Sequence, residues 1–352
     1  MLARDDNKPQ GFSNATSRFI RWLWMGLVVL ALVLAVTLLN NNFSFHRPSG
    51  GAVNAQLDHA LDAAIHWIKD NPEISERNPS MMYMIADMER MSHDPRLQAV
   101  LEHYHKHYLA YPATPFDFAW LRLIDRKAEV PVIHVPDLHG ELNEFAWGAY
   151  AVAPDKISLS PGDRANMFSP TRYIWGARQH QLLALVIYRD YNGSSPELDN
   201  TMNYLAEKIA RDAHYDSRIT DSYIQRTAFV LAAGRPDLIR RRWVERILDH
   251  QNADGSWNSC WYGWCRGIFE FRIVSGGDGH ATVQAAWALT MLKYRYPQWM
   301  AADAHPDHFF DRSGSLCGVA ERAGRGSGCF VGGSSARLWI TASATKALPA
   351  AL

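Results

Sequence analysis

The sequence has 352 residues, enough for a membrane-spanning segment followed by one large domain or two small ones. Its 36 basic residues balance 36 acidic residues, and because a nucleic-acid partner calls for a basic face, this balance argues against nucleic-acid binding. Aromatic residues are abundant, with 13 Trp and 14 Tyr, which suits either a deep apolar cavity or an ordinary large helical core.

An apolar stretch, residues 19–39, follows the polar amino-terminal segment 1–18. From Trp22 to Leu39 it contains no charged residue. A helix needs about 20 apolar residues to cross the hydrocarbon core of a bilayer. A cleaved signal peptide has a shorter apolar core that ends in a small-residue cleavage site, and no good site of that kind follows Leu39. The stretch therefore predicts an uncleaved transmembrane anchor.

The basic residues around this anchor predict its orientation. Arg4, Lys8, Arg18 and Arg21 precede or begin the apolar stretch, and only Arg47 closely follows it. Because Lys and Arg are enriched on the cytoplasmic side of membrane helices, the amino terminus is expected in the cytoplasm. The rest of the chain is then extracytoplasmic, which in a bacterium means periplasmic.

After the anchor, residues 40–53 are rich in Asn, Ser, Gly and Pro and predict a short linker. Helical patterns then succeed one another with few strand signals, which predicts one all-α domain over residues 54–352. Ser80 is the expected N-cap of the second helix. The predicted helices of the domain are 57–68, 81–91, 96–108, 116–124, 142–152, 173–191, 196–213, 221–233, 236–250, 281–294 and 336–348.

The middle of the domain is less regular. Residues 130–136 predict either a short strand or an extended connection, since each Pro removes a donor from a sheet ladder. Residues 153–170 contain Pro, Ser, Gly and Asp and predict a long surface loop. Loops of this length are often covering or functional elements, so a lid is one possible role.

A polar turn from Gln251 to Trp257 separates two helical patterns. Its Asn, Asp and Gly residues favour a turn, and Trp257 supplies a large apolar plate beneath it. The form Q-x-x-x-G-x-W resembles the QW repeat of the α/α-toroid families, the terpene cyclases and their protein-prenyltransferase relatives, mainly over residues 219–295. In those families the motif joins an outer helix to the next inner helix. The resemblance implies an α/α-toroid-like fold for residues 54–352.

A toroid encloses a cavity that aromatic and cationic side chains can line, although for each Arg taken alone an ordinary salt bridge is the favoured explanation. The expected ligand-binding residues are Trp257, Trp261, Trp264, Trp287, Arg172 and Arg226.

The acidic motifs of the cyclases are absent from the toroid region. Class II enzymes use D-x-D-D and class I enzymes use D-D-x-x-D, and the only similar pair, Asp5-Asp6, lies in the predicted cytoplasmic tail. The resemblance therefore speaks to architecture, because fold similarity does not carry function across.

The segment Ser275–His280 leads directly into a predicted helix, whose amino terminus can receive an anion or a polar group. Polysaccharide lyases and glycosidases also use α/α-toroids, in which carboxylates, Tyr or His act as acid and base. The catalytic candidates by this analogy are Asp221, Tyr223, Asp278 and His280. Simple helix capping by Asp278 or Thr282 is the alternative.

Four cysteines follow the anchor, in the compartment where disulfides persist. Four cysteines allow three pairings, and Cys260–Cys265 with Cys317–Cys329 is preferred because each pair closes a local Gly-rich loop. The alternative is a zinc site formed by Cys265, Cys317 and His280. The surrounding residues resemble the ligand motifs of lanthipeptide cyclases, except that Gly318 replaces the ligand His. No other cofactor is expected.

Other histidines carry weaker signals. His103, His105 and His107 alternate on a predicted helix, so their side chains point in different directions and do not converge on a metal. His134 and His139 lie near acidic residues in the irregular middle, where acid–base chemistry and simple surface polarity are both consistent with the pattern.

Two functional hypotheses follow. The first is a membrane-anchored extracytoplasmic domain that uses an aromatic cavity to bind a lipid, a peptide or a glycan. The second is an enzyme on the same scaffold, either a cyclase-like transferase or a lyase or hydrolase of an envelope polymer.

Overall fold

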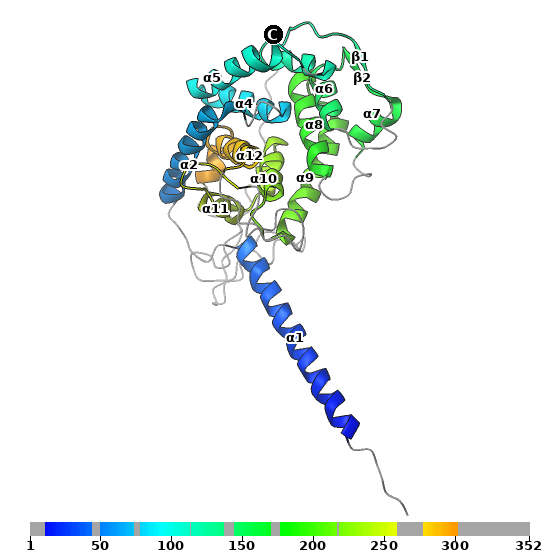
Figure 1. Cartoon of the computed structure of the whole chain (residues 1–352), viewed down its shortest axis with the longest axis vertical. Helices are drawn as coiled ribbons and strands as arrows, with labels where there is room; N and C mark the ends of the chain where they lie inside the picture. The colour runs from blue at the N-terminus through cyan, green and yellow to red at the C-terminus, as the bar shows by residue number, and fades with distance from the viewer. Residues whose placement is uncertain are drawn as a thin grey trace, which may run out of the picture.

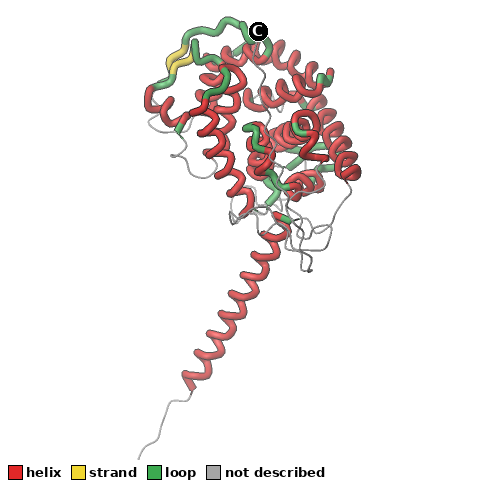
Figure 2. Tube along the Cα trace, turned by 180° about the vertical axis from the view of Figure 1, so that it is seen from behind, coloured by secondary structure: helices red, strands yellow, loops and turns green. Residues whose placement is uncertain are grey.

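A computed structural model describes residues 11–43, 50–73, 78–112, 114–136, 144–169, 177–216, 218–258 and 277–301. Across these ranges the chain is predominantly helical, as the sequence predicts. One long amino-terminal helix stands out from a group of packed helices (Figures 1 and 2). The predicted helix 336–348 lies outside the described residues.

The protruding helix is α1 (Gly11–Asn42). Its segment Thr16–Asn42 has a mean hydropathy of 2.6 and is long and apolar enough to cross a membrane. The apolar side chains between Phe19 and Val36 are exposed, because no other described part of the chain packs against them. The expected linker 40–53 differs from the structure at both ends, since residues 40–42 form the last turn of α1 and residues 50–53 form the first turn of the next helix.

The remaining helices are short and close-packed. Two of the described helices continue directly into a π-helical turn, and η2 is entirely 3-10 helix. Their bounds are α2 (Gly50–Asp70), α4 (Pro79–Ser92), α5 (Pro95–Tyr104), η1 (His105–Leu109), η2 (Pro115–Leu123), α6 (Glu144–Val152), α7 (Pro161–Phe168), α8 (Ala177–Asn192), α9 (Pro196–Tyr215), α10 (Asp221–Ala232), η3 (Pro236–Leu238), α11 (Arg241–Asp249), α12 (Gly279–Thr290), η4 (Met291–Arg295) and α13 (Pro297–Ala301).

Local sequence explains where these helices begin. Asn78 precedes Pro79 and caps α4 by accepting a hydrogen bond from the Ser80 amide, so the predicted cap at Ser80 is displaced by two residues. Asn78 is the cap in place of Ser80 because its side-chain oxygen accepts from a free amide at the helix start and because Pro79 fits the first helical position. Ser195 precedes Pro196 and caps α9 in the same way.

The irregular middle contains a small parallel sheet. β1 (Ile133–His134) pairs with β2 (Ile157–Ser158), which agrees with the short-strand alternative for residues 130–136. The prediction of a loop over 153–170 is wrong, because this range contains β2 and the helix α7. The Ser160 side chain accepts a hydrogen bond from the Asp163 amide and so caps α7, whose first residue is Pro161. In the sequence this capping pattern resembles part of a polar loop, which is why the helix was not predicted.

The core is centred on α12. Figure 1 shows α12 and α10 inside an arc formed by α2, α5, α6, α8 and α9. Every residue of α12 except His280 is buried. The side chains of α12 are mostly small or apolar on every side of the helix, which is typical of a helix enclosed by others. Trp287 projects from α12 and packs edge-on against Tyr83 of α4 and Phe229 of α10.

The turn between α11 and α12 is held by hydrogen bonds from the Gln251 side chain. Gln251 donates hydrogen bonds to the carbonyl oxygens of Ala60 in α2 and of Gly255 within the turn, at 2.8 and 2.9 Å. Gly255 has a φ of 91°, and a Cβ atom there would lie 2.4 Å from the Ala63 carbonyl oxygen. Glycine is therefore required both by the backbone conformation and by the close approach of α2.

Candidate functional site

Two of the predicted catalytic residues meet at the amino-terminal ends of α10 and α12. Asp221 is the first residue of α10, and His280 is the second residue of α12. The Asp221 carboxylate oxygen lies 2.7 Å from His280 Nδ1, and each side chain is about one-third exposed. The side-by-side starts of two central helices thus bring together residues that are 59 positions apart.

This pair has the geometry of an oriented imidazole. A carboxylate that accepts a hydrogen bond from Nδ1 leaves Nε2 as the basic nitrogen of the ring. Gln284, one turn further along α12, places its amide nitrogen 3.1 Å from His280 Nε2. Catalysis would also need a substrate or nucleophile at Nε2, and the chain from 259 to 276, which precedes α12, lies outside the described residues.

Asp278 caps α12. One of its carboxylate oxygens accepts hydrogen bonds from the amides of His280 and Ala281, at 2.8 and 3.1 Å. The alternative reading of this residue as a helix cap is therefore the one that the structure supports, and the pairing of His280 is with Asp221.

Tyr223 lies away from the Asp221–His280 pair. Its side chain is fully buried, and its hydroxyl donates a hydrogen bond to Asn41 Oδ1 at the end of α1, at 3.1 Å. Burial raises the pKa of the Tyr223 hydroxyl well above its ordinary value. A hydroxyl that is buried and already bonded in this way is suited to a structural role.

Arg226 forms a buried ion pair. Its guanidinium donates to Asp216 at 2.7 Å, and both side chains are nearly inaccessible to solvent. Burial acts to raise the Asp216 pKa, but hydrogen bonds from Arg218 and Arg226 outweigh that effect and hold the pKa below its ordinary value. Arg226 therefore serves as the salt-bridge partner of Asp216, the alternative that the sequence left open.

The two described tryptophans among the expected ligand-binding residues belong to the core. Trp257 and Trp287 are fully buried. The Trp257 indole donates to the Ile247 carbonyl, and the Trp287 indole donates to the Asp87 carboxylate, each at 2.7 Å. Their rings fill the space between helices where the sequence led us to expect a cavity wall. Trp261, Trp264 and Arg172 lie outside the described residues.

The cysteine predictions also lie outside the described residues. Cys260, Cys265, Cys317 and Cys329 are all in those parts of the chain, so both the disulfide pairing and the zinc alternative stay predictions. Of the expected zinc ligands, the described one is His280. Within the described ranges no group of three or more potential ligands gathers to hold a metal ion, and this includes the His103–His107 segment.

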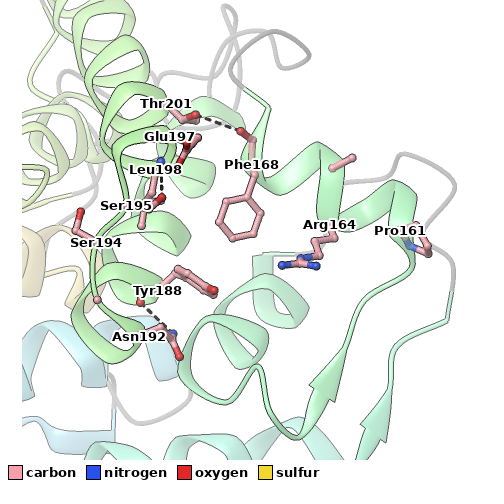
Figure 3. Close-up of a pocket in the computed structure, with 12 residues that line it drawn as sticks. Pro161, Arg164, Phe168, Tyr188, Asn192, Ser194, Ser195, Glu197, Leu198 and Thr201 are labelled. Carbon is pink, nitrogen blue, oxygen red and sulfur yellow. Dashed lines mark hydrogen bonds between the residues drawn. The ribbon is translucent and has the colours of Figure 1, made fainter.

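A pocket lies at a different place, between α7, the end of α8 and the start of α9. It has a volume of about 600 Å³. Figure 3 shows the Arg164 guanidinium pointing from α7 into this pocket, towards Phe168 and Tyr188. The lining residues are Pro161, Arg164, Ala165, Phe168, Tyr188, Asn192, Gly193, Ser194, Ser195, Glu197, Leu198 and Thr201.

Aromatic rings form one wall of the pocket. Phe168 packs edge-on against Tyr188, with ring centroids 5.1 Å apart, and Tyr188 stacks on Tyr150 behind it. The guanidinium of Arg164 lies beside the Tyr150 hydroxyl and opposes the rise in pKa that burial causes there. Among the described residues no carboxylate forms an ion pair with Arg164. The pocket thus combines aromatic faces, hydroxyl groups and an available positive charge.

No family model matches the chain, and neither a curated protein nor a solved structure matches it.

The sequence reasoning missed this pocket entirely. Its Arg and Phe lie on α7, within residues 153–170 where a loop was predicted. The signal that would have found it is the Ser160-Pro161 pair followed by Asp163, a helix start that places Arg164 and Phe168 one turn apart on the same face.

Proposed function

We propose that this chain is a single-pass membrane protein whose extracytoplasmic helical domain binds a small ligand in the pocket between α7, α8 and α9. The proposal has α1 as the anchor and the amino terminus in the cytoplasm, in line with the distribution of basic residues around the apolar stretch. The observation that carries the binding function is the pocket itself, which is of the size that small molecules occupy.

Within the classes that the sequence leaves open, the pocket favours a glycan over a lipid or a peptide. Phe168 offers a ring face on which a sugar can stack beside Tyr188, and the nearby hydroxyl and amide side chains offer hydrogen bonds. The single cation, Arg164, favours a ligand with a carboxylate. Glu197 on the opposite helix disfavours a ligand that carries several negative charges.

Replacement of Arg164 by Ala tests this proposal. An acidic oligosaccharide, such as one containing a uronate, is expected to bind the full chain in detergent, and R164A is expected to weaken binding about tenfold because one charge-assisted contact is lost. Titration calorimetry measures both affinities. The control is Arg211→Ala, which removes an exposed Arg elsewhere on α9. Equal affinities for R164A and R211A would contradict this assignment.

The α/α-toroid arrangement is part of the same proposal. Its support is the turn from Gln251 to Trp257, which ties α2 to the connection between α11 and the central helix α12. Helices that surround the central pair α10 and α12 are consistent with the inner and outer layers of a toroid.

A second function, an enzyme acting on an envelope polymer, is favoured by the 2.7 Å contact between Asp221 and His280. If the pair acts as general base, His280→Gln is expected to abolish release of sugar reducing ends from envelope polysaccharide while the circular dichroism spectrum stays unchanged. Gln keeps a similar size and hydrogen-bonding capacity, so it separates chemistry from packing. Absence of turnover by the unmodified chain would count against this function and leave the binding function standing.

A further inference from the structure

We infer that the face of the domain around the end of α1 rests in the phospholipid headgroup layer, with Tyr215 and Arg218 as its lipid contacts. This inference rests on the proposed role of α1 as a membrane anchor. It goes further, because it assigns a second interaction surface, places it on named residues and states that the domain has a fixed position on the bilayer.

The apolar part of α1 is as long as the hydrocarbon core of a bilayer is thick. The stretch 19–39, at 1.5 Å per residue, is about 30 Å long, which matches the hydrocarbon core of a bilayer. Leu39 then lies at the edge of the hydrocarbon. The helix continues without a break to Asn42, three residues further, so the docked end of α1 lies about 5 Å beyond that edge.

α1 becomes buried in the domain over a short distance. The exposed fraction of the residue is 64% at Val36, 36% at Leu39 and 0% at Asn41. Asn42 is also buried. The helix therefore changes from exposed to docked on the domain through Asn41 and Asn42 within about one and a half turns, which leaves no length of flexible chain between the apolar stretch and the docked residues.

Two arginines of the domain hold the end of α1. The guanidinium of Arg240 donates to the backbone carbonyl of Asn42 at 3.0 Å, and Arg242 donates to that of Asn40 at 3.1 Å. These carbonyls are at the end of α1, where a helix has no partners of its own and where its dipole favours a positive charge. The bonds fix the direction in which α1 leaves the domain.

Exposed residues suited to a membrane surface lie next to the point where α1 meets the domain. His214 Nδ1 lies 2.7 Å from Asn42 Oδ1, and the next residue, Tyr215, ends α9 and is 72% exposed. Arg218 follows, with 46% of its side chain exposed. Tyr is enriched at membrane–water interfaces, and the long Arg side chain can place its charge among headgroups.

The charges of this face predict which lipids it accepts. Arg218 is already paired with Asp216, with its Nε atom 3.0 Å from the carboxylate. Arg242, beside the end of α1, lies 3.5 Å from Glu245 and 3.8 Å from Asp249, so both arginines face carboxylates. The position of this face is set by the docking of α1 and does not depend on attraction to anionic lipid. We therefore expect the same contacts in zwitterionic and in anionic membranes.

The experiment uses a photo-crosslinking phenylalanine analogue in the full chain, placed at Tyr215 in one variant and at Tyr111 in another. Both tyrosines are exposed, but Tyr111 follows η1 at the end of α5, which Figure 1 shows on the far side of the domain from α1. In phosphatidylcholine vesicles, with and without phosphatidylglycerol, the probe at 215 is expected to crosslink lipid at least tenfold more than the probe at 111.

Alkaline extraction of the same vesicles separates this inference from the anchor on which it depends. If the chain resists extraction but both probes crosslink lipid equally, contact between lipid and the face around the end of α1 is refuted and the anchor stands. If alkali releases the chain, both the anchor and this lipid contact are refuted. Crosslinking at 215 only when phosphatidylglycerol is present would overturn the conclusion that docking alone sets the position.

Discussion

Replacement of Asn41 by Ala is expected to lower the free energy of unfolding of the domain by about 3 kcal/mol, a large effect for one residue. The Asn41 amide donates to the carbonyls of Ala213 and His214, and its oxygen accepts from the Tyr223 hydroxyl and the Arg246 guanidinium. All of these contacts are at least partly shielded from water. Removal of the side chain takes away each contact in a place where water replaces it poorly.

The matched control for this variant is Asn40→Ala. Asn40 is the neighbouring residue, but it is exposed, and its side-chain oxygen accepts one hydrogen bond, from Arg242. We expect this control to cost less than about 1 kcal/mol. Thermal unfolding in detergent, followed by near-ultraviolet circular dichroism, should show N41A melting roughly 5 °C or more below N40A. Identical melting temperatures would mean that α1 is not held by these buried contacts.

Replacement of Asp87 by Ala is expected to cost about 3 kcal/mol, because it removes a buried carboxylate that bonds a buried indole and two partly exposed guanidinium groups. The Asp87 carboxylate accepts from the Trp287 indole at 2.7 Å and from the guanidinium groups of Arg90 and Arg295, each at 3.1 Å. Its side chain is nearly inaccessible to solvent. The variant leaves the indole nitrogen of a fully buried ring without this acceptor.

Asp190→Ala is the control for this second variant. Asp190 also accepts from Arg90, at 3.0 Å, and from Arg126, but about one-third of its side chain is exposed. Exposed ion pairs contribute little because water screens them, so a cost under about 1 kcal/mol is expected. Denaturant titration of both variants gives the two values. If D190A proved as costly as D87A, burial would not be the cause of the effect.

The sequence by itself predicted the elements whose cause is local. The apolar stretch 19–39 predicts α1, and the helical periodicity between residues 57 and 294 predicts most of the helices to within a few residues. The turn at Gln251 could also be predicted, because its Gly requires a positive φ and its Trp requires cover. These features depend on a few neighbouring residues, so a pattern in the chain is enough to reveal them.

The candidate site was predicted in part. Asp221 and His280 were chosen as separate residues, each at the start of a helix, and their contact required α10 and α12 to begin side by side. Trp257 and Trp287 were expected to line a cavity, but a large aromatic ring reads the same in a sequence whether it faces a ligand or a core. The sequence could not separate these outcomes, because burial depends on all the helices at once.

Only the tertiary structure decided the long-range contacts. Asp87 reaches Trp287 across 200 positions, and Asn42 reaches His214 across 172. The three asparagines at positions 40–42 have a linker composition, because Asn disfavours the interior of a helix. They are nevertheless helical, since the carbonyls of α9 and the arginines around α11 offer their amides and backbone the partners that water would otherwise supply. Such partners come from distant parts of the chain, so a local pattern does not contain them.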